Sequence, residues 1–211
     1  MREQNTITLT TERSRFHTFL LCCGITGSAL FLIINFTFAA VSPNYDMARQ
    51  SIGELQSEPH GWIQSVNFIL AGIFMAGFGL GLRKEMINGL GAVSLPVIQI
   101  FVGVCFTLLG LLNHEPIHSA VGFIAMLLLL TEFAIFACRF SRDPRWKDWA
   151  TYTILSAALM ITMLVLDSWA RMNNSAYTGI FERAALLTRV IWTLFFTVKL
   201  LAGVRLGPVK A

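Results

Sequence analysis

Six long apolar blocks, separated by short polar segments, dominate the pattern of this chain. Each block has about 20 residues or more, which is the length an α-helix needs to cross the hydrocarbon core of a bilayer. The apolar residues run on without the regular polar alternation of a half-buried strand. The pattern predicts an all-α, polytopic membrane protein, a six-transmembrane-helix bundle forming one membrane domain over residues 1–211. The predicted spans are residues 16–41, 62–82, 90–112, 118–138, 150–170 and 182–204.

Composition and charge agree with a membrane protein. The chain is 55% hydrophobic and 13% charged, whereas soluble domains carry about 25% charged residues. Its net charge of +4 comes from basic residues that flank the apolar blocks. This placement indicates contact with anionic lipid headgroups. The expected partners are therefore membrane lipids and not nucleic acid.

The basic residues also predict the orientation of the bundle. Eleven lie in the N-terminal segment, in the links after the second and fourth spans, and in the tail: Arg2, Arg13, Arg15, Arg83, Lys84, Arg139, Arg142, Arg145, Lys147, Arg205 and Lys210. Three lie in the other links: Arg49, Arg171 and Arg183. Because basic loops stay in the cytoplasm, both termini are predicted to be cytoplasmic, in a multi-pass protein of the cell membrane. Trp62, Trp146, Trp149 and Trp169 lie near span ends, as interfacial aromatic residues do.

Many polar side chains fall on the predicted outer side. They are Asp46, Arg49, Glu54, Glu58, His60, His114, Glu115, His118, Asp167, Arg171, Glu182 and Arg183. Most of the links that carry them are short, so these groups are expected close together at the membrane surface. A charge held near hydrocarbon is costly unless it is paired or wet. The sequence therefore predicts an outward-facing polar bowl, partly closed by the first loop, residues 42–61.

Two histidines in this bowl suggest a metal. His114 and His118 are four residues apart, so they share a helix face if the fourth helix starts early. Pro116 disturbs the helix that a zinc-protease motif would need, and Glu115 is expected to cap the helix start instead. The alternatives are a divalent metal held by the two histidines, or histidines that are interfacial or hydrogen-bonded.

Some polar residues lie inside the spans and need partners. Asp167 and Arg171, four residues apart, are expected to form an ion pair. Arg189 lies about 10 Å below the start of its span at 1.5 Å per residue, and Glu182 or Glu132 is its expected partner. Other residues are expected to join helices. They are the polar Asn35, Gln64, Asn67 and Gln99 and the glycines Gly77, Gly81, Gly103 and Gly110.

The first loop and second span, SPNYDMARQSIGELQSEPHGWIQSVNFILAGIFMAGFGLGLR, resemble the bacterial and archaeal membrane family catalogued as domain of unknown function 998. The matching residues there are Ser42, Pro43, Tyr45, Asp46, Ile52, Leu55, Gly61, Trp62 and Arg83; Gly53 stands where the family pattern has serine. His118, Gly179, Glu182, Arg183 and Trp192 are similar to later family positions, with Glu182 in place of a glutamine. The resemblance implies six spans and no reaction. It directs attention to Asp46, Trp62, His118, Glu182 and Arg183.

Three functions remain open from the sequence. The first is binding of a lipid or small hydrophobic molecule in the outer bowl, by Asp46, Trp62, His118, Asp167, Glu182 and Arg183. The second is a membrane-embedded enzyme acting on a lipid or isoprenoid, with His118, Asp46 and Glu182 as candidate acid, base or metal-binding groups. The third is a small transporter, for which six spans would suffice as a homodimer, although no inverted repeat is evident.

Overall fold

The computed structural model describes residues 14–86 and 88–203. Six long helices run through them: α1 (Arg15–Val41), α2 (Trp62–Glu85), α3 (Ser94–Leu111), α4 (Ile117–Ser141), α5 (Lys147–Met172) and α6 (Thr178–Leu201). Two short 3-10 helices, η1 (Gly53–Ser57) and η2 (Pro144–Trp146), lie in the links, and the described residues contain no strand. All six long helices are apolar enough and long enough to cross a membrane. The all-helical prediction is confirmed, and the fold fits a multi-pass membrane protein.

The predicted spans match the helices closely. The largest differences, four residues, are at the start of the third helix, predicted at 90 and observed at Ser94, and at the start of the sixth, predicted at 182 and observed at Thr178. Inside a bilayer every backbone N–H and C=O must be satisfied within the segment, so an apolar run of this length can only be helical. The orientation of the bundle across the membrane stays a prediction.

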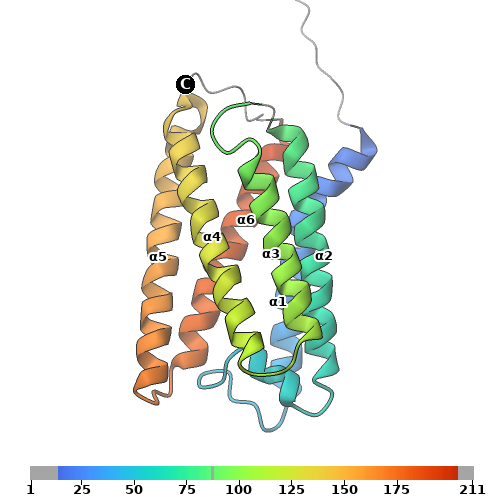
Figure 1. Ribbon diagram of the computed structural model, residues 1–211, viewed down its shortest axis with the longest axis vertical. Coiled ribbons are helices and arrows are strands. Elements are labelled where there is room, and N and C mark those ends of the chain that lie inside the picture. The colour runs from blue at the N-terminus through green and yellow to red at the C-terminus, as the bar shows by residue number, and fades with distance from the viewer. Residues whose placement is uncertain (1–13, 87, 204–211) are drawn as a thin grey trace, which may run out of the picture.

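The helices form a ring in chain order. Each long helix contacts the next, and α1 contacts α6 to close the ring. Figure 1 shows them running along one common axis, with the loop 42–61 at one end. We call this end the loop end; it also carries the α3–α4 and α5–α6 links. The opposite end, where α1 begins and α6 ends, is called the terminal end. The twelve outer-side polar residues of the sequence pattern therefore all lie toward the loop end, as predicted.

Small residues allow the helices on one side of the ring to approach closely. A Cβ built on Gly103 of α3 would lie 2.5 Å from the Gly72 carbonyl oxygen and 2.8 Å from the Ala76 nitrogen of α2. Gly81 of α2 packs in the same way against the backbone at Leu20 of α1. The predicted role of these glycines in helix contact is confirmed, because only hydrogen fits where two helix backbones touch.

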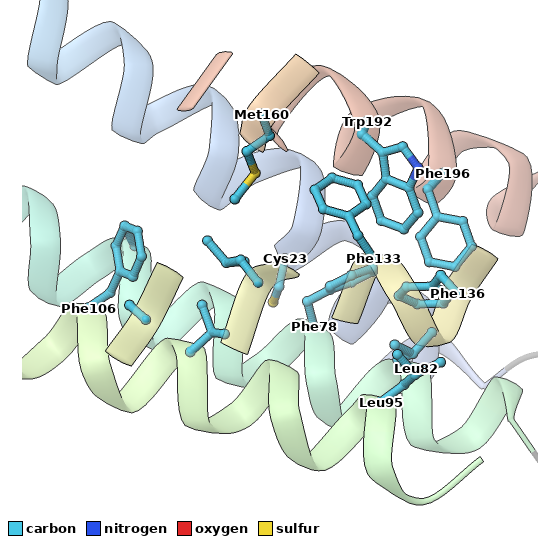
Figure 2. Packing of buried hydrophobic residues seen from close by; sticks show 14 of the residues in the cluster. Cys23, Phe78, Leu82, Leu95, Phe106, Phe133, Phe136, Met160, Trp192 and Phe196 are labelled. Carbon is cyan, nitrogen blue, oxygen red and sulfur yellow. The ribbon is translucent and has the colours of Figure 1, made fainter. Parts of the chain in front are cut away.

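The aromatic residues of the core gather between α4 and α6. The rings of Phe133, Phe136, Trp192 and Phe196 crowd together in Figure 2, with centroids 4.8–5.1 Å apart in four pairs. Trp146 of η2 adds to this cluster and is fully buried. Trp146 lies between the ends of two spans, as predicted, but its indole packs inside the protein and is not exposed. A short 3-10 turn folds the indole back over the helix ends, where it stacks on Phe140.

Replacing a glycine by alanine should have opposite effects on stability at two positions of the bundle. Gly103→Ala forces a methyl group against the backbone of α2 and should lower the free energy of unfolding by about 1–3 kcal/mol. Gly122→Ala on α4 meets nothing closer than Leu109 Cδ2 at 4.0 Å. It should leave stability unchanged or raise it by up to about 1 kcal/mol, because alanine favours a helix over glycine. Thermal unfolding in detergent compares the two variants. Equal midpoints would contradict close packing of α2 on α3.

Candidate functional site

A cavity of about 1000 Å³ lies inside the ring and extends from the loop end past the middle of the helices, where Cys23, Phe78 and Thr193 line it. Its walls are mainly apolar. Phe31, Phe68 and Phe106 contribute rings from α1, α2 and α3, and their centroids are 5.5–6.0 Å apart. The facing wall comes from α4, α5 and α6, whose apolar residues in the cavity include Met126, Leu129, Leu130, Met160, Leu164 and Leu186. In Figure 2, Phe106 and Met160 lie apart from the aromatic cluster of α4 and α6.

Charged side chains of α5 and α6 stand at the loop-end rim of the cavity. The Arg171 Nε donates to Asp167 Oδ2 at 2.9 Å, and its Nη2 donates to Glu182 Oε2 at 3.2 Å. Glu182 Oε2 also accepts the backbone N–H of Ile52, at 3.2 Å, from the first loop. The predicted pair of Asp167 and Arg171 is thus confirmed. It belongs to a small network that ties two helix ends to the loop.

Arg183 holds the first loop in place. Its Nη1 donates to three backbone carbonyls, those of Met47, Gln50 and Gly179, each at 2.9 Å, and its Nη2 donates to the Tyr45 hydroxyl. Burial raises the pKa of Tyr45 to about 12, so this hydroxyl keeps its proton and donates it to the Ser51 carbonyl. Arg183 is buried and does not line the cavity. It is therefore a clamp on the loop, which the sequence did not distinguish from a ligand-binding residue.

His118 stands at the rim between the first loop and α4. Its ring meets the edge of Phe68 with a centroid distance of 6.3 Å, and its Nδ1 lies 3.9 Å from Glu115 Oε1. A Cβ built on Gly53 would come 2.7 Å from His118 Cε1. The glycine therefore leaves the imidazole the room that a side chain at position 53 would occupy. The buried Nε2 of His118 has no hydrogen-bond partner among the described residues.

Among the described residues, His114 and His118 are not joined by a third metal-binding side chain. His114 is exposed, whereas His118 turns into the cavity. Across residues 14–86 and 88–203, no group of three or more His, Cys, Asp or Glu side chains could hold a metal ion. The described chain thus offers the predicted pair no third protein ligand, as a zinc site would require.

Two further predicted residues lie outside the cavity. Asp46 is exposed on the loop, where its Oδ1 accepts the Ala48 N–H at 2.9 Å and its Oδ2 is 3.7 Å from Arg49. Trp62 begins α2 with 65% of its surface exposed. Neither lines the cavity. Of the predicted ligand-binding residues, His118, Asp167 and Glu182 line the cavity. Asp46, Trp62 and Arg183 do not line it and lie in or beside the first loop.

A buried ion pair lies beside the cavity near the middle of the bundle. Arg189 Nη2 donates to Glu132 Oε2 at 2.7 Å and to Gln99 Oε1 at 2.8 Å, which joins α6 to α4 and α3. Of the two partners expected for Arg189, Glu132 is the one that binds it. Arg189 and Gln99 both line the cavity. The sequence indicated that this arginine needed a partner but gave no sign that it faced an open space.

The clamp of Arg183 can be tested on the loop. In Arg183→Lys a single ammonium replaces a guanidinium that reaches three carbonyls and a phenol, so the loop 42–61 should exchange its amide hydrogens at least about fivefold faster. Arg49→Lys is the matched control, because Arg49 is exposed on the same loop. Hydrogen exchange followed by mass spectrometry measures both. Unchanged protection in Arg183→Lys, or an equal change in the control, would contradict the clamp.

Comparison with known proteins gives a family but no activity. The family model described as "Protein of unknown function (DUF998)" matches residues 25–199, which is more than half of the chain. No curated protein and no solved structure matches the chain. The matched residues include most of those that line the cavity, its charged rim and the buried ion pair. The chain belongs to the DUF998 family.

Proposed function

We propose that this protein binds a lipid-like amphiphile in the cavity, with the apolar part of the ligand inside and its polar head at the rim. The observation that carries the proposal is a cavity of about 1000 Å³ with apolar walls and a charged edge. Ligand sites in proteins have this character: mostly apolar linings with a few polar groups that fix orientation. The volume is at the upper end of the usual range of about 300–1,000 Å³, which suits a long ligand.

The ligand enters from the membrane. Phe123 of α4 and Val165 and Trp169 of α5 line the cavity and are also exposed on the outside of the bundle. Residues with both properties mark a side opening between these two helices. In Figure 1 these two helices stand side by side at the terminal end and are further apart at the loop end. An apolar ligand moving sideways from lipid avoids transfer through water.

The rim favours a head that is neutral or cationic and donates hydrogen bonds. Four carboxylates line this part of the cavity, from Glu54, Glu115, Asp167 and Glu182, against the single guanidinium of Arg171. The excess of negative charge repels an anionic head. Asp167 lines this part of the cavity, and its carboxylate can accept a hydrogen bond from a ligand hydroxyl or amine.

Filling the cavity tests the proposal. Gly122 lines it and has open space in front of its Cα, so Gly122→Phe projects a ring into the cavity without displacing backbone. We expect the lipid that co-purifies with the protein, measured by mass spectrometry after extraction, to fall by about tenfold, or about 1.4 kcal/mol of binding free energy.

The matched control is Ile33→Phe, which adds a ring on the exposed side of α1 away from the cavity. It should retain the bound lipid of the unaltered protein. Thermal unfolding of both variants verifies that they fold. The proposal is contradicted if the purified protein carries no lipid, or if the Gly122→Phe variant carries as much lipid as the Ile33→Phe control.

A further inference from the structure

The guanidinium of Arg171 lies where the proposed function puts the polar head of the ligand. Its Nε donates to Asp167 Oδ2 at 2.9 Å, and its Nη2 donates to Glu182 Oε2 at 3.2 Å. All three side chains line the cavity at the rim. The protein therefore already holds one cation between two carboxylates at this position.

These side chains are accessible from outside the protein. The side chain of Arg171 is 46% exposed, and that of Glu182 is 27% exposed. An ion pair with this much exposure contributes little to stability, because solvent screens the attraction and long side chains lose freedom when they pair. Arg171 also belongs to the last turn of α5, so its side chain can turn outward past the helix end. A cationic group in the cavity can thus take its place.

The two carboxylates keep their positions without Arg171. Glu182 Oε2 also accepts the backbone N–H of Ile52 at 3.2 Å, from the first loop. Arg183 clamps the same loop, so this donor is fixed independently of Arg171. Asp167 is carried by α5, and most of its side chain is buried. Departure of Arg171 therefore leaves two preset acceptors whose charge, close to hydrocarbon, is costly unless another cation follows.

The two bonds of Arg171 select the kind of cation. Nitrogens of one guanidinium bridge oxygens on two different helices, so both oxygens lie within reach of one small cation. A primary ammonium carries three N–H donors on a single nitrogen and can bond both carboxylates. A quaternary ammonium has the same charge but no donor, and an alcohol has one donor but no charge. The arrangement therefore fits a primary ammonium best.

We propose that the cavity takes an amphiphile with a primary ammonium head, and that this head displaces Arg171 from Asp167 and Glu182. Arg171 is then a specificity-determining residue that acts by competition. It occupies the two carboxylates until a ligand brings an ammonium and an apolar chain together. This inference rests on the proposed function, since it assigns the head of the same ligand, and it narrows a neutral or cationic head to one chemical class.

Three probes with the same long alkyl chain test the head. One carries a primary amine, which is protonated at neutral pH as the lysine side chain is. The second carries a trimethylammonium group, and the third carries an alcohol. Equilibrium binding of each radiolabelled probe to the purified full-length protein in a neutral detergent gives the relative affinities. We expect the amine to bind about tenfold more tightly than either of the others, because it alone combines charge with N–H donors.

Removal of the resident cation gives the sharpest contrast. In Arg171→Ala the affinity for the amine should rise by at least about fivefold, because the ligand no longer competes with the guanidinium for the binding-competent state. The affinity for the alcohol should stay within about twofold. Asp167→Asn removes one of the two carboxylates, so the preference for the amine over the alcohol should fall to about threefold or less.

Arg49→Ala is the matched control for charge. It removes the same positive charge from the loop end, but Arg49 is exposed on the first loop and does not line the cavity. Its affinity for the amine should stay within about twofold of the unaltered protein. Thermal unfolding verifies that each variant folds. Should Arg171→Ala not fold, Arg171→Gln, which keeps a long polar side chain without the charge, decides the question.

The outcomes separate the two proposals. The ammonium head is wrong if the amine binds no better than the alcohol or not at all, if Arg171→Ala leaves its affinity unchanged or lowers it, or if Arg49→Ala raises it equally. The proposed function survives those results as long as the purified protein carries lipid. If no probe binds and no lipid co-purifies, the proposed function fails, and the assignment of the head fails with it.

Discussion

The buried ion pair between Arg189 and Glu132 is the interaction on which this bundle most depends. Charge in a hydrocarbon environment must be paired, and here the pairing fixes α6 against α4, with Gln99 bringing in α3. The aromatic cluster of Phe133 and Trp192 packs beside the same pair. The cavity runs past this pair from the loop end, and Arg189 and Gln99 form part of its wall.

A second buried arginine, Arg183, fixes the first loop at the loop end of the bundle. Arg183 binds the carbonyls of the first loop and so folds a polar segment over the loop end of the ring. Arg189 thus contributes to the cavity wall, while Arg183 fixes the loop that covers the loop end. Asp167, Arg171 and Glu182 form an ion-pair network at the rim, where a ligand head would bind.

The sequence predicted more of the fold than of the site. The length of the apolar segments was enough to predict the spans, because a bilayer excludes an unpaired backbone. The four-residue spacing was enough to predict the ion pair of Asp167 and Arg171, because residues i and i+4 share a helix face. The cavity was not predictable, since apolar residues facing lipid, core or cavity look alike along the chain. Trp62 and Trp146 were both taken as interfacial, yet one is exposed and the other fully buried. The sequence placed Arg183 in the ligand site, because its acceptors are backbone carbonyls, which every residue has and which a sequence pattern therefore cannot identify.

The central claim is that a lipid chain occupies the cavity, and photo-crosslinking measures this directly. Met160 and Leu129 line the cavity yet are almost fully shielded, with 1% and 7% exposed, whereas Leu155 of α5 faces outward with 63% exposed and does not line it. The full-length protein is reconstituted with a lipid that carries a photoreactive group at its chain end, and the crosslinked peptides are mapped. Crosslinks at Met160 and Leu129 as well as Leu155 are predicted. Crosslinks at Leu155 without any at Met160 or Leu129 would contradict the account.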